Sequence, residues 1–131
     1  MRAVPNKLRV AGPARRDIVD ILRWSGEQFG AAAALRYDAL IRQALCDLRT
    51  DPNRPGSRER PDLMASGART YHLFFSRDHV SGDRVKQPRH FLLYRVRPDG
   101  VIEVARILHD SRDLERHLPE DYKAPSAWLR T

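Results

Sequence analysis

The stretch RHFLLYRVRPDGVIEVARILH, residues 89–109, decides the fold of this chain. It contains two runs rich in aromatic and β-branched residues, Arg89–Arg97 and Val101–His109, a composition typical of β-strands. Pro98–Gly100 between them has a tight-turn sequence, so we predict an antiparallel hairpin. The first run is almost uninterruptedly apolar, which predicts a strand covered on both faces at the centre of a sheet.

Two helices are predicted upstream of this hairpin. The first begins at Gly12-Pro13, because a proline at the first helical position loses no hydrogen bond, and it ends at Gly30. Its apolar face carries Ile18, Ile21, Leu22 and Phe29, with Ser25 beside them. The second helix should run from about Ala31 to Arg49, and one intervening glycine implies an antiparallel pair. Its predicted buried stripe is Ala34, Tyr37, Ile41, Ala44, Leu45 and Leu48, with Asp38, Arg42 and Asp47 turned outward.

The other segments complete an α+β domain. Lys7–Ala11 should form a short first strand, and Asp51–Pro61 reads as a polar loop. Arg69–Phe75 should form another strand, and Ser76–Pro88 an inserted ribbon or loop. The order strand-helix-helix-strand-strand-strand predicts an antiparallel sheet with the helical hairpin on one face, in a single domain over residues 1–131 with its core at 7–118.

Composition limits the classes of function. The net charge of +7 suits an anionic partner, either nucleic acid or an acidic protein segment. No apolar run reaches the length of a membrane span and no signal peptide is evident, so a cytoplasmic protein without membrane contact is expected. The single cysteine, Cys46, excludes an internal disulfide and is expected to be a small core thiol.

Four motifs then follow one another along the chain. They are the proline-started helix with Asp17, Ile18 and Ile21; the stop Phe29-Gly30; the strand His90–Val96; and Arg106–His109 followed by Asp113-Leu114 and Arg116–Leu118. In this order they resemble the ParE branch of the RelE/ParE toxins of bacterial toxin–antitoxin pairs, over roughly Leu8–Leu118. Two departures stand out: Ser76–Pro88 is longer than the connection usual in that family, and Ser66–Arg69 stands where many members have G-L-R.

The resemblance implies one of two activities. ParE-like toxins poison DNA gyrase, whereas RelE-like toxins cut messenger RNA on the ribosome. Cutting RNA needs a general base, an acid and a group that stabilises the phosphate. Arg95, Arg106, His109, Arg116 and His117 offer an acid and a phosphate clamp, but the chain lacks the closing tyrosine of many RNA-cutting relatives. Gyrase inhibition without catalytic residues is therefore the favoured interpretation, and the ribosome-dependent endoribonuclease is the alternative.

The predicted target-binding residues are Arg106, His109, Asp113, Arg116 and His117. A plain structural alternative exists for the same block: a short helix Ser111–Leu118 that caps the core through its leucines and exposes its charges to water. The resemblance further implies a ParD-like antitoxin whose C-terminal segment wraps the toxin, and we expect Trp24 and Phe29 to be its apolar anchors. DNA would then be met only through the antitoxin or gyrase.

No metal or other cofactor is expected. The five histidines include no pair at the i, i+4 spacing of a helical metal site, and the closest pair in sequence joins a strand to a loop. A third class therefore stays open beside the two toxins: a small basic relative without toxicity that binds nucleic acid or a partner protein.

Overall fold

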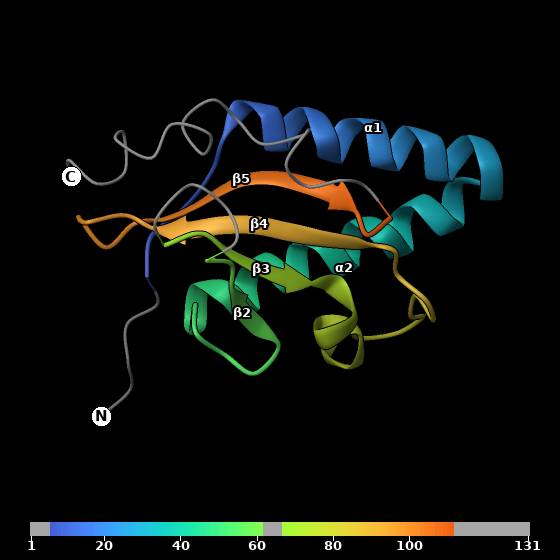
Figure 1. Cartoon of the computed structure of the whole chain (residues 1–131). Helices are drawn as coiled ribbons and strands as arrows, with labels where there is room; N and C mark the ends of the chain where they lie inside the picture. The colour runs from blue at the N-terminus through green and yellow to red at the C-terminus, as the bar shows by residue number, and fades with distance from the viewer. Residues whose placement is uncertain (1–5, 62–66, 112–131) are drawn as a thin grey trace.

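The computed structural model describes residues 6–61 and 67–111 of the chain. Five strands form one sheet in the order β1-β5-β4-β3-β2, and two long helices form a hairpin packed against it (Figure 1). The elements are β1 Leu8–Val10, α1 Gly12–Phe29, α2 Ala31–Thr50, β2 Ser57–Glu59, β3 Arg69–His72, the 3-10 helix η1 Leu73–His79, β4 His90–Val96 and β5 Ile102–His109. The α+β class and the helix pair on one sheet face are confirmed.

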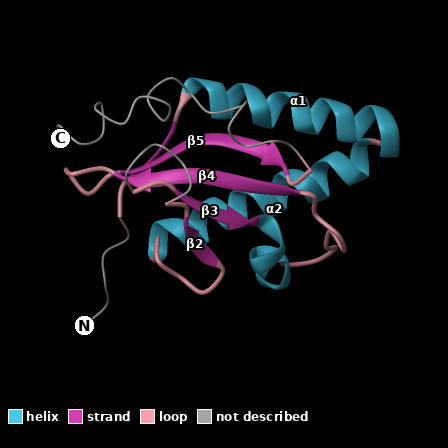
Figure 2. Ribbon diagram, viewed as in Figure 1, coloured by secondary structure: helices cyan, strands magenta, loops and turns pink. Residues whose placement is uncertain are grey.

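The helix boundaries follow from local sequence. Pro13 lies in the first turn of α1, where its missing N–H costs nothing. Gly30 separates the helices with a φ of 94°, a conformation that glycine adopts without strain. Its N–H donates to the Gly26 carbonyl and its own carbonyl accepts from Ala34, so one residue ends α1 and begins α2. Figure 2 shows the two helices meeting at this sharp corner.

The sheet is centred on β4, as its apolar sequence predicted. β4 pairs antiparallel with β3 on one side and with β5 on the other. The predicted tight turn is present: the Gly100 N–H donates to the Arg97 carbonyl, and Gly100 has a φ of 86°. The sheet is mixed rather than wholly antiparallel, because β1 pairs parallel with β5.

The core lies between the helical hairpin and the sheet. Leu92, Tyr94, Ile102, Val104 and Ile107 cover the helix-facing side of β4 and β5, where they are almost fully buried. The apolar stripe of α2 packs against them through Leu40, Ile41, Ala44 and Leu48. Each such side chain stabilises the fold by roughly 1.5–3 kcal/mol relative to exposure, so this layer holds the hairpin in place.

The segment between α2 and β4 differs from the prediction in three ways. Ser57–Glu59, predicted as loop, is the edge strand β2 and pairs only with β3. The strand predicted to reach Phe75 ends at His72, whose Nδ1 accepts from the Phe74 N–H and starts η1. Of the predicted ribbon or loop, residues 76–79 belong to η1, and the chain then continues as an irregular segment whose Val80 is buried in the core.

Three side chains also lie elsewhere than predicted. Asp47, expected on the outer face of α2, is buried, because η1 packs over it and supplies hydrogen-bonding partners. Cys46, expected in the core, is exposed because it lies one residue off the buried stripe. Phe29, expected on the buried face of α1, is 68% exposed, because α1 extends beyond the sheet at its C-terminal end.

Candidate functional site

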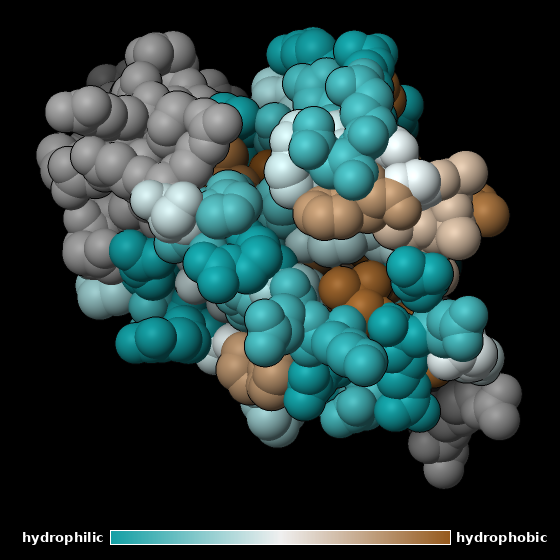
Figure 3. Space-filling model, turned by 90° about the vertical axis from the view of Figure 1, so that its right-hand side faces the viewer, coloured by the Kyte–Doolittle hydropathy of each residue, from teal (hydrophilic) through white to brown (hydrophobic). Residues whose placement is uncertain are grey.

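A cavity of about 880 Å³ opens at the end of the molecule where the helical hairpin turns. Ile21, Trp24 and Phe29 of α1 form one wall, and residues 82–87 form the opposite wall. Tyr37 of α2, His90 of β4 and His109 of β5 line it between these walls. Figure 3 looks at this end of the molecule and shows apolar surface at its centre, flanked by hydrophilic side chains. Its volume lies in the usual range of ligand and anchor-residue sites.

The two predicted anchor residues lie together on this cavity. The rings of Trp24 and Phe29 are 5.5 Å apart in an edge-to-face arrangement, and Trp24 is 54% exposed. Large apolar side chains left in water at a cavity mouth mark interaction sites more often than scattered surface residues do. The structure thus brings together the two residues predicted for antitoxin binding, whose role stays a prediction.

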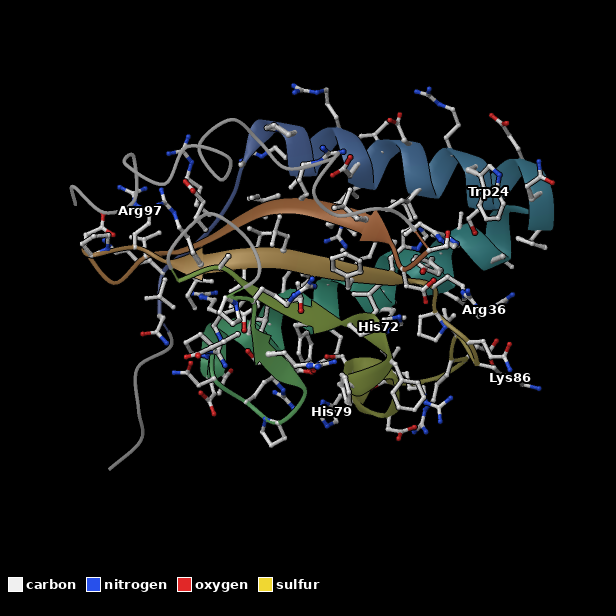
Figure 4. The ribbon with its side chains drawn as sticks, viewed as in Figure 1. Trp24, Arg36, His72, His79, Lys86 and Arg97 are labelled. Atoms are coloured by element: carbon white, nitrogen blue, oxygen red, sulfur yellow. The ribbon has the colours of Figure 1, made fainter. Side chains whose placement is uncertain are left out.

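Cations surround the cavity mouth. Arg84 is 3.3 Å from Asp78, and Arg89 is 3.1 Å from Asp110. Arg36 and Lys86 also line the cavity, and neither forms an ion pair with another residue in the described ranges 6–61 and 67–111. Figure 4 shows both at the same end of the molecule as Trp24. Asp83 is the one carboxylate among the cavity-lining residues, so the charged residues of the lining are four cations and one anion.

Tyr37 and His90 form a half-buried polar contact at the cavity. The Tyr37 hydroxyl lies 2.6 Å from His90 Nδ1 and accepts a hydrogen bond from the Arg89 N–H at 3.1 Å. Burial raises the pKa of Tyr37 to about 12, so the hydroxyl stays protonated and donates a hydrogen bond to His90 Nδ1. Burial, together with the neighbouring His109, lowers the pKa of His90 to about 4. His90 is therefore neutral near pH 7, with its own proton on Nε2.

Three histidines gather at one end of the sheet. The rings of His90 and His109 are 5.2 Å apart, as their opposed positions on β4 and β5 require. His72, at the end of β3, lies 3.2 Å from Asp110. Burial tends to raise the pKa of Asp110, but His72 and Arg89 outweigh it and hold that pKa below its usual value. No group suited to a metal ion is found among the residues that the structure describes.

This cluster was missed by sequence reasoning. Along the chain the nearest histidine to His72 is His79. The sheet instead brings His72 toward His90 and His109. In the structure β3 ends at His72, β4 begins at His90 and β5 ends at His109, and adjacent antiparallel strands bring these ends together. The predicted strand Arg69–Phe75 placed His72 in its middle, so the sequence could indicate only the proximity of His90 and His109.

Arg106, a predicted target-binding residue, is engaged within the fold. Its Nε and Nη2 donate to the two carboxylate oxygens of Asp17 on α1, at 2.7 and 2.9 Å. The same carboxylate accepts the Ile107 N–H at 2.9 Å and so satisfies part of the β5 edge beyond β1. These hydrogen bonds from Asp17 raise the pKa of Arg106. The family-like Asp17 thus joins α1 to β5.

The other predicted target-binding residues divide into two groups. His109 lines the cavity, and its Nδ1 accepts the Ser111 N–H at 3.1 Å, which leaves the Nε2 edge as its remaining polar side. Asp113, Arg116 and His117 lie outside the described residues, as does the rest of the helix predicted from Ser111. The structure therefore brings together His109, Trp24 and Phe29, and assigns Arg106 to a structural contact.

A second polar network fastens η1 to α2. Buried Asp47 accepts from the Ser76 hydroxyl at 2.6 Å, contacts His79 Nδ1 at 2.8 Å and accepts from Gln43 at 2.9 Å. Burial tends to raise the pKa of Asp47, but these hydrogen bonds outweigh it and lower the pKa. The network lies away from the cavity mouth, and it fixes the start of the segment that forms the second cavity wall.

Comparison with known proteins gives one family match and two similar solved structures. A family model described as the ParE toxin of the type II toxin–antitoxin system parDE matches residues 8–114. The fold is similar to a solved chain of a chromosomal ParDE toxin–antitoxin system from P. aeruginosa, with a TM-score of 0.60 and 18% identity over 79% of this chain and 95% of that one. A chain of the RelBE2 toxin–antitoxin complex from Mycobacterium tuberculosis matches with a TM-score of 0.45 and 21% identity, over 81% and 99%. None of the curated proteins matches the chain. Neither long helix in the described part has the apolar run that a membrane crossing needs.

Proposed function

The chain belongs to the ParE toxin family of type II toxin–antitoxin systems, and from this membership we propose that it inhibits DNA gyrase and is neutralised by a cognate ParD-like antitoxin. Both partners would be met in the cytoplasm. Neither action needs a cofactor or catalytic turnover by the chain itself. The target and the antitoxin contact are proposed separately, because different residues are predicted for them, although His109 of the target-binding set also lines the cavity.

The antitoxin contact is supported by the cavity at the hairpin end. Trp24 and Phe29 are more than half exposed there, and such apolar surface is favourable only when a partner covers it. A cavity of about 880 Å³ accommodates one or two large side chains of an amphipathic segment. This exposed apolar cavity is the observation that carries the proposed binding of an antitoxin.

Gyrase is preferred to RNA as the target for a chemical reason. A ribonuclease needs a proton donor and a guanidinium that can hold a phosphate. Arg106 is committed to Asp17 in a two-pronged contact, and Arg95 lies 3.4 Å from Glu103. His90, with a pKa of about 4, is a poor acid at neutral pH. These commitments favour an inhibitor that acts by binding, with the block Arg106–His117 near its contact with gyrase.

One experiment tests the target. The chain is expressed in a bacterial host, and supercoiling by purified gyrase is assayed in parallel with transcript integrity in the cells. We expect growth arrest, loss of supercoiling and intact RNA. Codon-phased cuts with normal supercoiling would support the ribosome-dependent endoribonuclease instead. Normal growth with neither effect would leave a non-toxic relative.

The C-terminal block is tested by a double variant. Arg116→Ala with His117→Ala should relieve growth arrest while binding to the protein encoded by the neighbouring reading frame persists. The reason is that target and antitoxin contacts are assigned to different residues. Undiminished growth arrest would remove the block from the proposed mechanism.

A further inference from the structure

The segment Val80–Arg89 between η1 and β4 belongs to no helix or strand, and part of it forms one wall of the cavity. Its residues 82–87 face Trp24 and Phe29 across the hollow, and Val85 packs against the core at the base of the wall. From the resemblance, Ser76–Pro88, which includes most of this segment, is expected to be longer than the connection usual in the family. The chain therefore has a cavity wall where a short connection would leave an open side.

This wall is fixed before any partner arrives. At its start, Val80 is 7% exposed and the preceding Ser76 and His79 are held by Asp47. In its middle, Arg77 donates to the Lys86 carbonyl at 2.6 Å. At its end, the Arg89 N–H donates to the Tyr37 hydroxyl. A preformed wall lowers the ordering cost of binding and fixes which side chains face the occupant.

A positively charged side chain lies on each of two elements that line the hollow. Lys86 comes from the wall and Arg36 from α2, and both lie at the same end of the molecule in Figure 4. Arg84 and Arg89 are paired with Asp78 and Asp110, whereas Arg36 and Lys86 form no ion pair within residues 6–61 and 67–111. Two cations flanking an apolar hollow favour a carboxylate beside an apolar side chain.

We infer that Val80–Arg89 is the specificity-determining wall of the antitoxin site. The cavity takes an acidic segment of the antitoxin, with one apolar side chain between Trp24 and Val85 and a carboxylate between Arg36 and Lys86. This inference rests on the proposed function, in which the partner is an antitoxin.

Nucleic acid fits these observations less well. A phosphate backbone is held by a run of cations along its length, because it carries a charge at every nucleotide. Here two cations without an ion pair to any described residue lie beside a mainly apolar hollow, and the Trp24–Phe29 pair is edge-to-face rather than a stacked platform. The wall therefore suits a protein segment with one or a few carboxylates.

The test uses the full chain and the purified protein encoded by the neighbouring reading frame. Its dissociation constant is measured by calorimetry at low salt for the wild type, Arg36→Glu, Lys86→Glu and Arg97→Glu. Arg97 lies on the turn side of β4, at the opposite end of the molecule in Figure 4, and its variant changes the net charge equally. We expect Arg36→Glu and Lys86→Glu each to weaken binding about tenfold or more, and Arg97→Glu less than about twofold.

Two further variants separate charge from folding. Lys86 is exposed, so Lys86→Met should fold as the wild type does and still lose affinity, whereas Lys86→Arg should retain it. Equal affinities for Lys86→Glu and Arg97→Glu would overturn the inference and leave the proposed function standing. Competition by a single-stranded oligonucleotide for the wild-type cavity, abolished in Lys86→Glu, would also overturn it. Failure of the wild type to bind the neighbouring protein would instead count against the proposed function.

Discussion

His90 illustrates how one side chain records its surroundings. It contacts Tyr37 and lies near His109 and His72. It also interacts electrostatically with the carboxylates of Asp110 and Asp17. Burial and the two histidines oppose its protonation more strongly than the carboxylates favour it, so its pKa falls from 6.5 to about 4. The folded protein therefore keeps His90 neutral over a pH range in which the unfolded chain protonates it.

This difference predicts a loss of stability in mild acid. Between pH 6.5 and 4 the unfolded chain binds a proton at His90 that the folded protein does not. The free energy of unfolding therefore decreases as the pH is lowered through this range, by at most about 3 kcal/mol. Asp47 and Asp110 have lowered pKa values and lose their contributions only below about pH 4. Urea unfolding at pH 7 and 4.5 should show a smaller decline in His90→Asn, whose amide can still accept from Tyr37. Parallel declines in the two proteins would contradict this assignment.

The Asp17–Arg106 contact predicts that Arg106 variants lose stability before they lose any contact with a target. Both side chains are mostly buried, so Asp17→Ala or Arg106→Ala leaves a charge without its partner and should cost about 2–4 kcal/mol. The double variant should cost less than the sum of the two, which a double-mutant cycle in urea would measure. Additive effects would show that the two groups do not interact. Any toxicity assay of Arg106 variants needs this stability measurement beside it.

At the scale of elements, Asp47 decides where η1 sits. It joins α2 to Ser76 and His79, and its removal leaves the buried Ser76 hydroxyl with the Tyr71 hydroxyl alone. Asp47→Ala should therefore lower the free energy of unfolding by about 2–3 kcal/mol and speed hydrogen exchange in Leu73–His79. Asp38→Ala is a matched control on the same helix, because Asp38 pairs with exposed Arg42 and should cost less than about 0.5 kcal/mol. Equal costs for the two variants would contradict the network's role.

The sequence predicted the elements whose signals are local. The helices have a 3.6-residue apolar period and a glycine stop, and the β4–β5 hairpin has a tight-turn sequence between two apolar runs. β2 was not predicted, because its three residues, Ser57–Glu59, are polar and become a strand only by pairing with β3. Asp47 was assigned to solvent because a helical period cannot indicate that a distant 3-10 helix will cover an acidic residue.

The candidate site was predictable only in part, for the same reason. Trp24 and Phe29 lie five residues apart on one helix and were predicted as joint anchors. Arg36, Lys86 and His90 complete the cavity from α2, an irregular segment and β4, so their proximity depends on the tertiary fold. His109, predicted as a target-binding residue, lines the cavity, whereas Arg106 on the same strand contacts α1; the functional role of both stays a prediction.

At the scale of the whole molecule, buried and exposed apolar side chains have different roles. The core beneath the hairpin holds the fold together, whereas Trp24 and Phe29 lie beyond it and are left in water. Exposed side chains contribute little to folding, so replacing them should leave stability nearly unchanged. Their contribution should appear only when a partner excludes water from the cavity.

The double variant Trp24→Ala with Phe29→Ala tests this separation of stability from binding. Its free energy of unfolding should stay within about 0.5 kcal/mol of the wild type, because neither ring belongs to the core. Its affinity for the neighbouring reading frame's product should fall by about 2 kcal/mol or more, as when a central aromatic anchor is truncated. Val19→Ala is the control, since Val19 is 52% exposed on the same helix and does not line the cavity, so its affinity should be unchanged. If the double variant instead lost several kcal/mol of stability and kept its affinity, the two rings would be supports of the fold, and the partner would have to bind elsewhere.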